Sequence, residues 1–195
     1  MGLFRAAIGV CAISVAAAGA VLAQSAPASP AFAAEELTPP PTDMWATFGG
    51  NLANQRYSPL DQIDKDNVGQ LKAEWRASLG GSGITPRASN QGEPFYFDGV
   101  LYVTTSDNDV FAVDVETGRQ LWSYYAKLDP ELRAACCGWA SRGMGMGAGK
   151  IFIGRQDAVL EALDQKTGEL VWSVRIADPL EHYSITSAPR YYDGM

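Results

Sequence analysis

A repeat with a period of 50 residues constrains this chain more than any other feature of its sequence. The segment Ala112–Gly118, followed by Trp122, recurs as Ala162–Gly168, followed by Trp172, with every matched position offset by 50. A self-match at a fixed period of this size is typical of repeat architectures, in which each unit buries its apolar face against its neighbours. The chain is therefore expected to fold as an array of similar units.

Each unit has the pattern of a four-stranded antiparallel sheet. In the first unit the expected strands are residues 95–97, 100–104, 110–114 and 120–125. The first two flank Asp98-Gly99, a strong signal for a two-residue hairpin turn, and Gly118 supplies the positive φ that the later turn needs. Repeated sheets of this kind are the blades of a β-propeller, so the fold class is all-β. Trp122 and Trp172 are expected to pack one blade against the next.

The second unit repeats this order, and a third begins near Met195. The expected strands of the second unit are residues 150–154, 159–164 and 170–175. Because Tyr192-Asp193-Gly194 mirrors Phe97-Asp98-Gly99, the sequence stops inside a hairpin. We therefore expect residues 34–195 to form a partial propeller, truncated at the C-terminus, that holds only the first two to three blades. The segment 43–79, with Trp45 and Trp75, is a candidate for an outer strand that closes the ring elsewhere.

The first 33 residues have the pattern of an export signal. Arg5 precedes the apolar run Ala6–Leu22, and small-x-small sites follow, so cleavage is expected after Ala23 or after Ala33. An uncleaved membrane anchor is the other interpretation, but the run of 17 residues is short and rich in Ala. We therefore expect a periplasmic protein with no stable membrane span after cleavage.

The charge of the chain argues against nucleic acid as a partner. Its 15 Lys and Arg are scattered along the sequence, and its 22 Asp and Glu leave a net charge of -7. Nothing in this pattern resembles the basic stripe that neutralises phosphates.

Two adjacent cysteines, Cys136 and Cys137, lie between the two repeat units, and only Cys11 of the export signal accompanies them in the chain. Neighbouring Cα atoms lie about 3.8 Å apart across a trans peptide, below the usual disulfide span of about 4.4–6.8 Å. A bond between them would be strained, and strain of that kind is usual at functional sites. Two free or metal-binding thiols are the alternative, which is weakened because His182 is the only histidine.

The sequence resembles the methanol and ethanol dehydrogenases that depend on pyrroloquinoline quinone (PQQ). The likeness lies in the run from Cys136 to Gly143, in Tyr183–Pro189 and in the Asp-x-x-Thr-Gly-x-x-x-Trp pattern of the blades. It extends to residues 45–50, 56–60 and 63. The cysteine pair five residues before Arg142, inside the blade repeat, gives the resemblance its specificity. It implies an eight-bladed propeller with PQQ on the ring axis.

The resemblance also implies roles for individual residues. Cys136 and Cys137 would form a disulfide that stacks on one face of the quinone, and Arg142 would contact the reactive carbonyl oxygens. A permanently protonated guanidinium suits an oxygen that gains electrons. Thr186 would donate a hydrogen bond to the cofactor. Gln91 occupies the position of a family Glu, and it keeps the acceptor but loses the charge.

Without the family resemblance, the residues themselves allow other roles. A surface ion pair is the alternative for Arg142, and an ordinary hydroxyl at the start of a strand is the alternative for Thr186. Glu93 lies two residues after Gln91 and would replace it at the cofactor if the register of the strand were shifted.

The implied function is an oxidoreductase that transfers a hydride from an alcohol to PQQ and passes the electrons to an acceptor such as a cytochrome c. In the family, calcium or a lanthanide holds the quinone and an Asp removes the hydroxyl proton. Those groups come from later blades, so no catalytic base and no metal ligand is expected in this chain, and the fragment is expected to be inactive. The alternative is a cofactor-free propeller that serves as a periplasmic binding or assembly scaffold. A third possibility, an inactive pseudogene product or an incomplete gene model, is compatible with the first interpretation.

Overall fold

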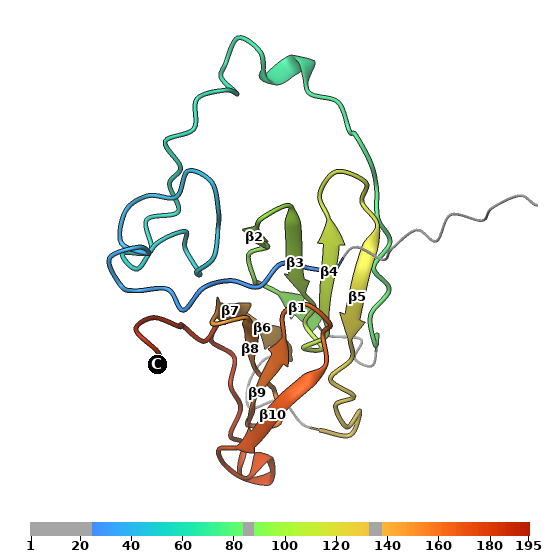
Figure 1. The fold of residues 1–195 in the computed structure, drawn as a ribbon. Helices are drawn as coiled ribbons and strands as arrows, with labels where there is room; N and C mark the ends of the chain where they lie inside the picture. The colour runs from blue at the N-terminus through green and yellow to red at the C-terminus, as the bar shows by residue number, and fades with distance from the viewer. Residues whose placement is uncertain (1–24, 84–87, 133–137) are drawn as a thin grey trace, which may run out of the picture.

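A computed structural model describes residues 25–83, 88–132 and 138–195 of the chain (Figure 1). Two four-stranded antiparallel sheets dominate the structure and lie side by side. A short parallel pair of strands joins them, and two 3-10 helices lie in the connecting segments, η1 at Val68–Gln70 and η2 at Pro179–Glu181. The prediction of an all-β chain with four-stranded blades is confirmed.

The first blade consists of β2 (Phe95–Phe97), β3 (Val100–Thr104), β4 (Val110–Asp114) and β5 (Gln120–Tyr124), in that spatial order. Asp98 and Gly99 form the predicted two-residue turn, with φ values of 44° and 79°. Every residue of β4 is buried, as expected for a strand between two others and between two packed faces.

The second blade consists of β7 (Met144–Gly147), β8 (Lys150–Gly154), β9 (Val159–Asp164) and β10 (Leu170–Arg175). Its strands follow the order of the first blade, since β7, like β2, is the strand at the inner edge. Pro189 and Tyr191 lie directly against Gly145 and Gly147 of β7, where any side chain would collide with them. The start of the third repeat unit therefore packs on the inner strand of the second blade.

Trp122 joins the two blades as the sequence predicts. Its indole Nε1 donates a hydrogen bond of 3.0 Å to the carbonyl of Gln165, and its ring covers Gly168, where a Cβ would lie 2.5 Å from the ring. Trp75 repeats this arrangement on the first blade: it donates to the carbonyl of Val115 at 2.7 Å and covers Gly118. The segment around Trp75 thus lies against the first blade in the way that β5 lies against the second.

In the part of the chain that the structure describes, no helix has the length and apolarity needed to cross a membrane.

Candidate cofactor site

Three of the predicted cofactor-binding residues, Gln91, Arg142 and Thr186, lie along a hydrogen-bonded ladder that runs from blade to blade. Its first part is the parallel pair of β1 (Ala88–Asn90) and β6 (Trp139–Ser141). The ladder continues past both strands, because the Gln91 N–H donates to the carbonyl of Ser141 at 2.8 Å and the Arg142 N–H donates to the carbonyl of Thr186 at 3.1 Å. Gln91 and Arg142 thus hold equivalent positions, each just before the inner strand of its blade.

The two blades approach each other closely behind these residues. A Cβ at Gly92 would lie 2.9 Å from the Cα of Gly143, a distance that real Cβ atoms do not reach. Glycine immediately after Gln91 therefore permits the approach and brings Gln91 and Arg142 to the same edge of the structure.

Arg142 and Thr186 are in direct contact. The Arg142 Nη1 donates a hydrogen bond of 2.7 Å to the Thr186 Oγ1, although the two residues are 44 positions apart in the sequence. The guanidinium is exposed, and within the described ranges it has no carboxylate partner at ion-pair distance. An ion pair therefore does not account for the position of Arg142 in this part of the chain, and most of its N–H donors remain available.

Gln91 is also exposed, and its only side-chain hydrogen bond among the described residues is a donation from Nε2 to the Ser89 Oγ at 3.2 Å. Its amide is free to turn toward a ligand at small cost.

Glu93 serves a different purpose from that of Gln91. Its carboxylate accepts hydrogen bonds from the Trp45 Nε1 at 3.1 Å, the Gly49 N–H at 2.8 Å and the Arg56 Nε at 2.6 Å. Burial alone would raise the pKa of Glu93, but the hydrogen bonds from Gly49, Arg56 and Trp45 outweigh it and lower the pKa. The side chain fastens the N-terminal loop to the first blade, which argues against Glu93 as a replacement for Gln91.

Cys136 and Cys137 lie outside the described residues, so their pairing and their position stay predictions. The residues on either side of that gap are held together, because the buried Trp139 donates from Nε1 to the carbonyl of Leu132 at 3.3 Å. Leu132 and Trp139 are therefore close together, and β6, which begins at Trp139, ends one residue before Arg142.

Sequence reasoning missed the buried polar residues that link the β3–β4 turn to β6, the strand that leads into the ladder. Asn108, in the β3–β4 turn, donates to the carbonyl of Gly154 at 3.2 Å and accepts from the Gln156 N–H at 2.9 Å. The side chain of Gln156 in turn donates to the carbonyl of Ala140 in β6. The signal in the sequence was the polar run Asp107–Asp109 between two apolar strands, which is easily interpreted as an exposed turn although all three residues are buried.

A buried ion pair between Arg155 and Glu161 lies next to the segment that carries Thr186. Glu161, 2% exposed, accepts hydrogen bonds from Arg155 Nη1 at 2.5 Å and from the hydroxyl of Tyr124 of the first blade at 2.7 Å. Desolvation first, and then the bond to Glu161, raises the pKa of Tyr124. The carbonyl of Arg155 accepts from the Ile185 N–H at 3.0 Å. Arg155 therefore fixes the backbone immediately before Thr186.

Comparison with known proteins agrees with this arrangement. Residues 45–173 match the model of the glucose/ethanol/alcohol dehydrogenase β-propeller domain family, named for PQQ. The quinoprotein alcohol dehydrogenase PedH of Pseudomonas putida is 42% identical over 148 residues, which cover 76% of this chain and 24% of that protein. The dehydrogenase subunit of the quinone alcohol dehydrogenase of Gluconacetobacter polyoxogenes is 40% identical over 157 residues, or 77% of this chain and 21% of the relative.

Among solved structures, a europium-containing methanol dehydrogenase superposes with a TM-score of 0.69 at 30% identity, covering 77% of this chain and 26% of that one. The chain thus spans about a quarter of the length of the relatives that it matches. From its blades, its inter-blade ladder and the extent of the family match, the chain belongs to the β-propeller family of PQQ-dependent alcohol dehydrogenases.

Proposed function

We propose that this chain is the N-terminal part of a periplasmic quinoprotein oxidoreductase that oxidises an alcohol by hydride transfer to PQQ. The observation that carries the proposal is the contact between Arg142 and Thr186 across two repeat units, next to Gln91 on the same ladder. Three residues that the family resemblance assigns to the cofactor are thereby gathered at one edge of the blades. The family match disfavours a cofactor-free scaffold as the alternative.

The chemistry of the gathered side chains fits PQQ, which carries carboxylates and quinone oxygens and so accepts hydrogen bonds. The side chains offered are a guanidinium, an amide and hydroxyl groups, while the nearby carboxylate of Glu93 is occupied by Arg56, Trp45 and Gly49. A set of donors with no free carboxylate suits an electron-rich, anionic ligand.

PQQ supplies the two-electron chemistry when it is bound. In this proposal Arg142 places a fixed positive charge beside the oxygens that gain electron density, and that charge favours the reduced form and the transition state. Thr186 holds the guanidinium in place and offers its hydroxyl, and the Gln91 amide donates from the neighbouring blade. The two backbones approach each other closely at Gly92 and Gly143, which brings the Gln91 and Arg142 side chains to one edge.

The remaining machinery is proposed for the complete protein, not for this chain. It comprises the base, the calcium or lanthanide ion that activates the quinone, and an electron acceptor such as a cytochrome c. The chain alone spans about a quarter of its relatives, and we propose that it is inactive by itself.

The test replaces Arg142 by Lys in the complete enzyme loaded with PQQ. Lys keeps the charge but loses the planar fork, so we expect turnover to fall at least about tenfold, which equals about 1.4 kcal/mol of barrier. Arg119→Lys, in the exposed β4–β5 turn, is the matched control and should leave turnover and melting temperature unchanged. If both variants turn over at the rate of the parent enzyme, Arg142 is not part of the cofactor site and the proposal is wrong.

A further inference from the structure

The segment Ser25–Leu37 is built into the blades, although part of it overlaps the predicted export region. Three of its apolar side chains are almost fully buried: Ala26 is 1% exposed, Phe32 2% and Leu37 3%. Figure 1 shows this segment in blue, crossing the view where the two sheets meet. We call residues 25–37 the strap.

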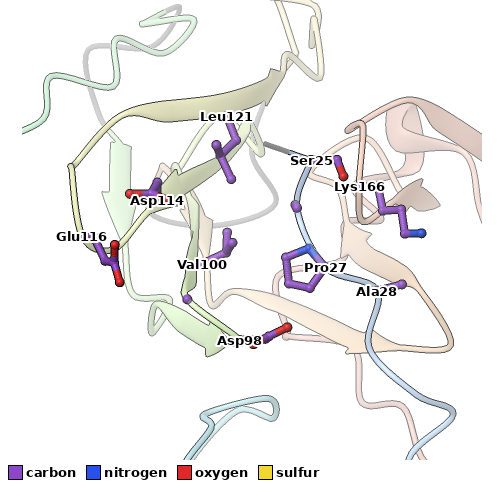
Figure 2. Close-up of a pocket in the computed structure, with 11 residues that line it drawn as sticks. Ser25, Pro27, Ala28, Asp98, Val100, Asp114, Glu116, Leu121 and Lys166 are labelled. Carbon is purple, nitrogen blue, oxygen red and sulfur yellow. The ribbon is translucent and has the colours of Figure 1, made fainter. Parts of the chain in front are cut away.

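The strap runs along the boundary between the first and the second blade. Figure 2 shows Pro27 and Ala28 of the strap between Val100 and Asp98 of the first blade and Lys166 of the second. Further along, the Phe32 ring meets the Phe97 ring edge-on, with centroids 6.1 Å apart. The strap therefore contacts both blades.

Backbone hydrogen bonds fix the strap to the turn between β7 and β8. The Gly149 N–H donates to the carbonyl of Ser29 at 2.8 Å, and the Ala148 N–H donates to the carbonyl of Pro30 at 2.7 Å. These two turn donors would otherwise lack a partner from the sheet.

A buried amide also depends on the strap. Gln165 is 0% exposed, and its Oε1 accepts two hydrogen bonds from Ser29, one from the N–H at 2.8 Å and one from the hydroxyl at 2.7 Å. Its Nε2 donates to the hydroxyl of Tyr102 in the first blade at 3.1 Å. Without Ser29, the Gln165 oxygen would lose both donors while the backbone around it stays in place.

The strap is anchored beyond Phe32 as well. The carbonyl of Phe32 accepts from the Asp193 N–H at 2.9 Å, and the Asp193 Oδ1 accepts from the Ala34 N–H at 3.0 Å. The contacts thus continue without a break from Ala26 to the start of the third repeat unit.

We propose that the strap belongs to the mature protein and that the export signal is removed after Ala23. Cleavage after Ala33 would discard Ala26, Ser29 and Phe32 and would leave an apolar groove and an unsatisfied amide between the blades. Val21 and Ala23 supply the small residues that the processing enzyme needs. This inference rests on the export proposed above.

The strap and the candidate cofactor site are at opposite ends of β7. Arg142 lies two residues before Met144, where the strand begins, whereas the strap binds Ala148, next to the last strand residue Gly147. Failure of the processing assignment therefore leaves the cofactor site untouched, and the reverse is also true.

The direct test is the N-terminus of the complete protein, produced with its own leader in a Gram-negative host. N-terminal sequencing and intact mass of the periplasmic product should give Gln24 as the first residue, less one ammonia if Gln24 cyclises. A first residue of Ala34, or any other first residue beyond Ser25, overturns the inference but leaves export intact. A product that keeps Met1 and stays in the cytoplasm overturns both.

A matched pair of variants separates the two cleavage positions. Ala23→Tyr should block processing so that the precursor accumulates, because the position before the cut requires a small side chain. Ala33→Tyr should be processed as the parent chain is. Normal processing of the Ala23→Tyr chain would contradict the inference, and this result does not depend on how stably either variant folds.

Hydrogen exchange tests whether the strap is part of the mature fold. In the mature enzyme the Gly149 amide should be protected, and deletion of residues 24–33 should speed its exchange by at least about tenfold. Equal exchange rates in the two proteins would show that the strap does not bind the turn.

Discussion

At the scale of single residues, the structure distinguishes Gln91 from Glu93, which the sequence left as alternatives for one contact with the cofactor. Gln91 is exposed and nearly unbonded on the inter-blade ladder, while Glu93, two positions on, is held by Trp45, Gly49 and Arg56. Alternation along a strand suggested the same face for both residues. The irregular backbone at Gly92, pressed against Gly143, precedes β2 and breaks that alternation.

The lowered pKa of Glu93 makes a pH-dependent contribution to stability. The ionised carboxylate is favoured in the folded protein, so its contribution is complete above the unfolded value of 4.5 and is lost as the pH falls through the folded pKa. Glu93→Gln in the complete enzyme should lower the free energy of unfolding by about 1–2 kcal/mol at pH 7.

The measurement is a set of urea unfolding curves between pH 7 and pH 3 for both proteins. The difference between them should shrink as the pH falls below about 4.5. A difference that is the same at every pH would show that the charge of Glu93 contributes nothing.

The cysteine pair is a second prediction at this scale. Cys136 and Cys137 are expected to be bonded to each other in the exported protein, because they are adjacent and residues 24–195 contain no other cysteine. The intact mass without reductant should lie two hydrogens below that of the dithiol. Two thiols that react with an alkylating agent before any reduction would contradict the prediction.

At the scale of the elements, two tryptophans fasten successive units in the same way. Trp75 covers Gly118 and Trp122 covers Gly168, and each indole donates to a backbone carbonyl in the turn that it covers. The glycine in each turn therefore has two functions: it adopts a positive φ, and it leaves room for the ring.

Alanine substitutions separate those two functions. Gly168→Ala would place a Cβ 2.5 Å from the Trp122 ring at a φ of +75°, whereas Gly99→Ala has a similar φ of +79° and nothing within 4 Å. Both variants lose stability through backbone strain, and only Gly168→Ala also displaces the Trp122 ring. We expect Gly168→Ala to lose about 1–3 kcal/mol more stability than Gly99→Ala in chemical unfolding of the complete enzyme. Equal losses would mean that the Trp122 contact is unimportant.

The elements that the sequence predicted are those with an apolar pattern and a turn signal at each end. The strands of the first blade and the later strands of the second lie within a residue of their expected bounds. Strand β7 is not among the strands expected for the second unit, because its alternating Gly and Met residues lack the usual strand composition. The β1–β6 pair has three residues a side, which is too short for any periodicity.

The candidate site was predicted through a resemblance and not through geometry. The sequence could assign Arg142 and Thr186 to one cofactor, but it could not show that they touch or that a backbone ladder joins their blades. Gln156, Gln165 and Asn108 were missed because a polar residue in a turn gives no sign of its burial. Their side chains bond groups distant in the sequence: the carbonyls of Ala140 and Gly154, the Tyr102 hydroxyl and Ser29.

At the scale of the whole molecule, the sheets in the described residues are two blades, and a propeller hides its sheet edges only when about four to eight blades close the ring. On β10, the side chains of Leu170, Val171 and Val174 are about half exposed. Exposed apolar strands of this kind favour aggregation.

We therefore predict that residues 24–195, produced alone in a periplasm with PQQ, calcium and a dye acceptor, show no alcohol oxidation and remain largely insoluble. The pocket on the ring axis would have binding groups on one side only. The assay follows dye reduction with ethanol or methanol, and the complete enzyme serves as the positive control. Turnover above the rate of a host that lacks the chain would refute the prediction.

In the proposed function, the edge formed by Gln91, Arg142 and Thr186 binds the quinone. The most direct measurement is a crystal structure of the complete enzyme with PQQ bound. We predict that an Arg142 guanidinium nitrogen lies within hydrogen-bond distance, about 2.7–3.2 Å, of a quinone oxygen. A bound quinone that leaves Arg142 and Thr186 facing solvent would contradict the claim.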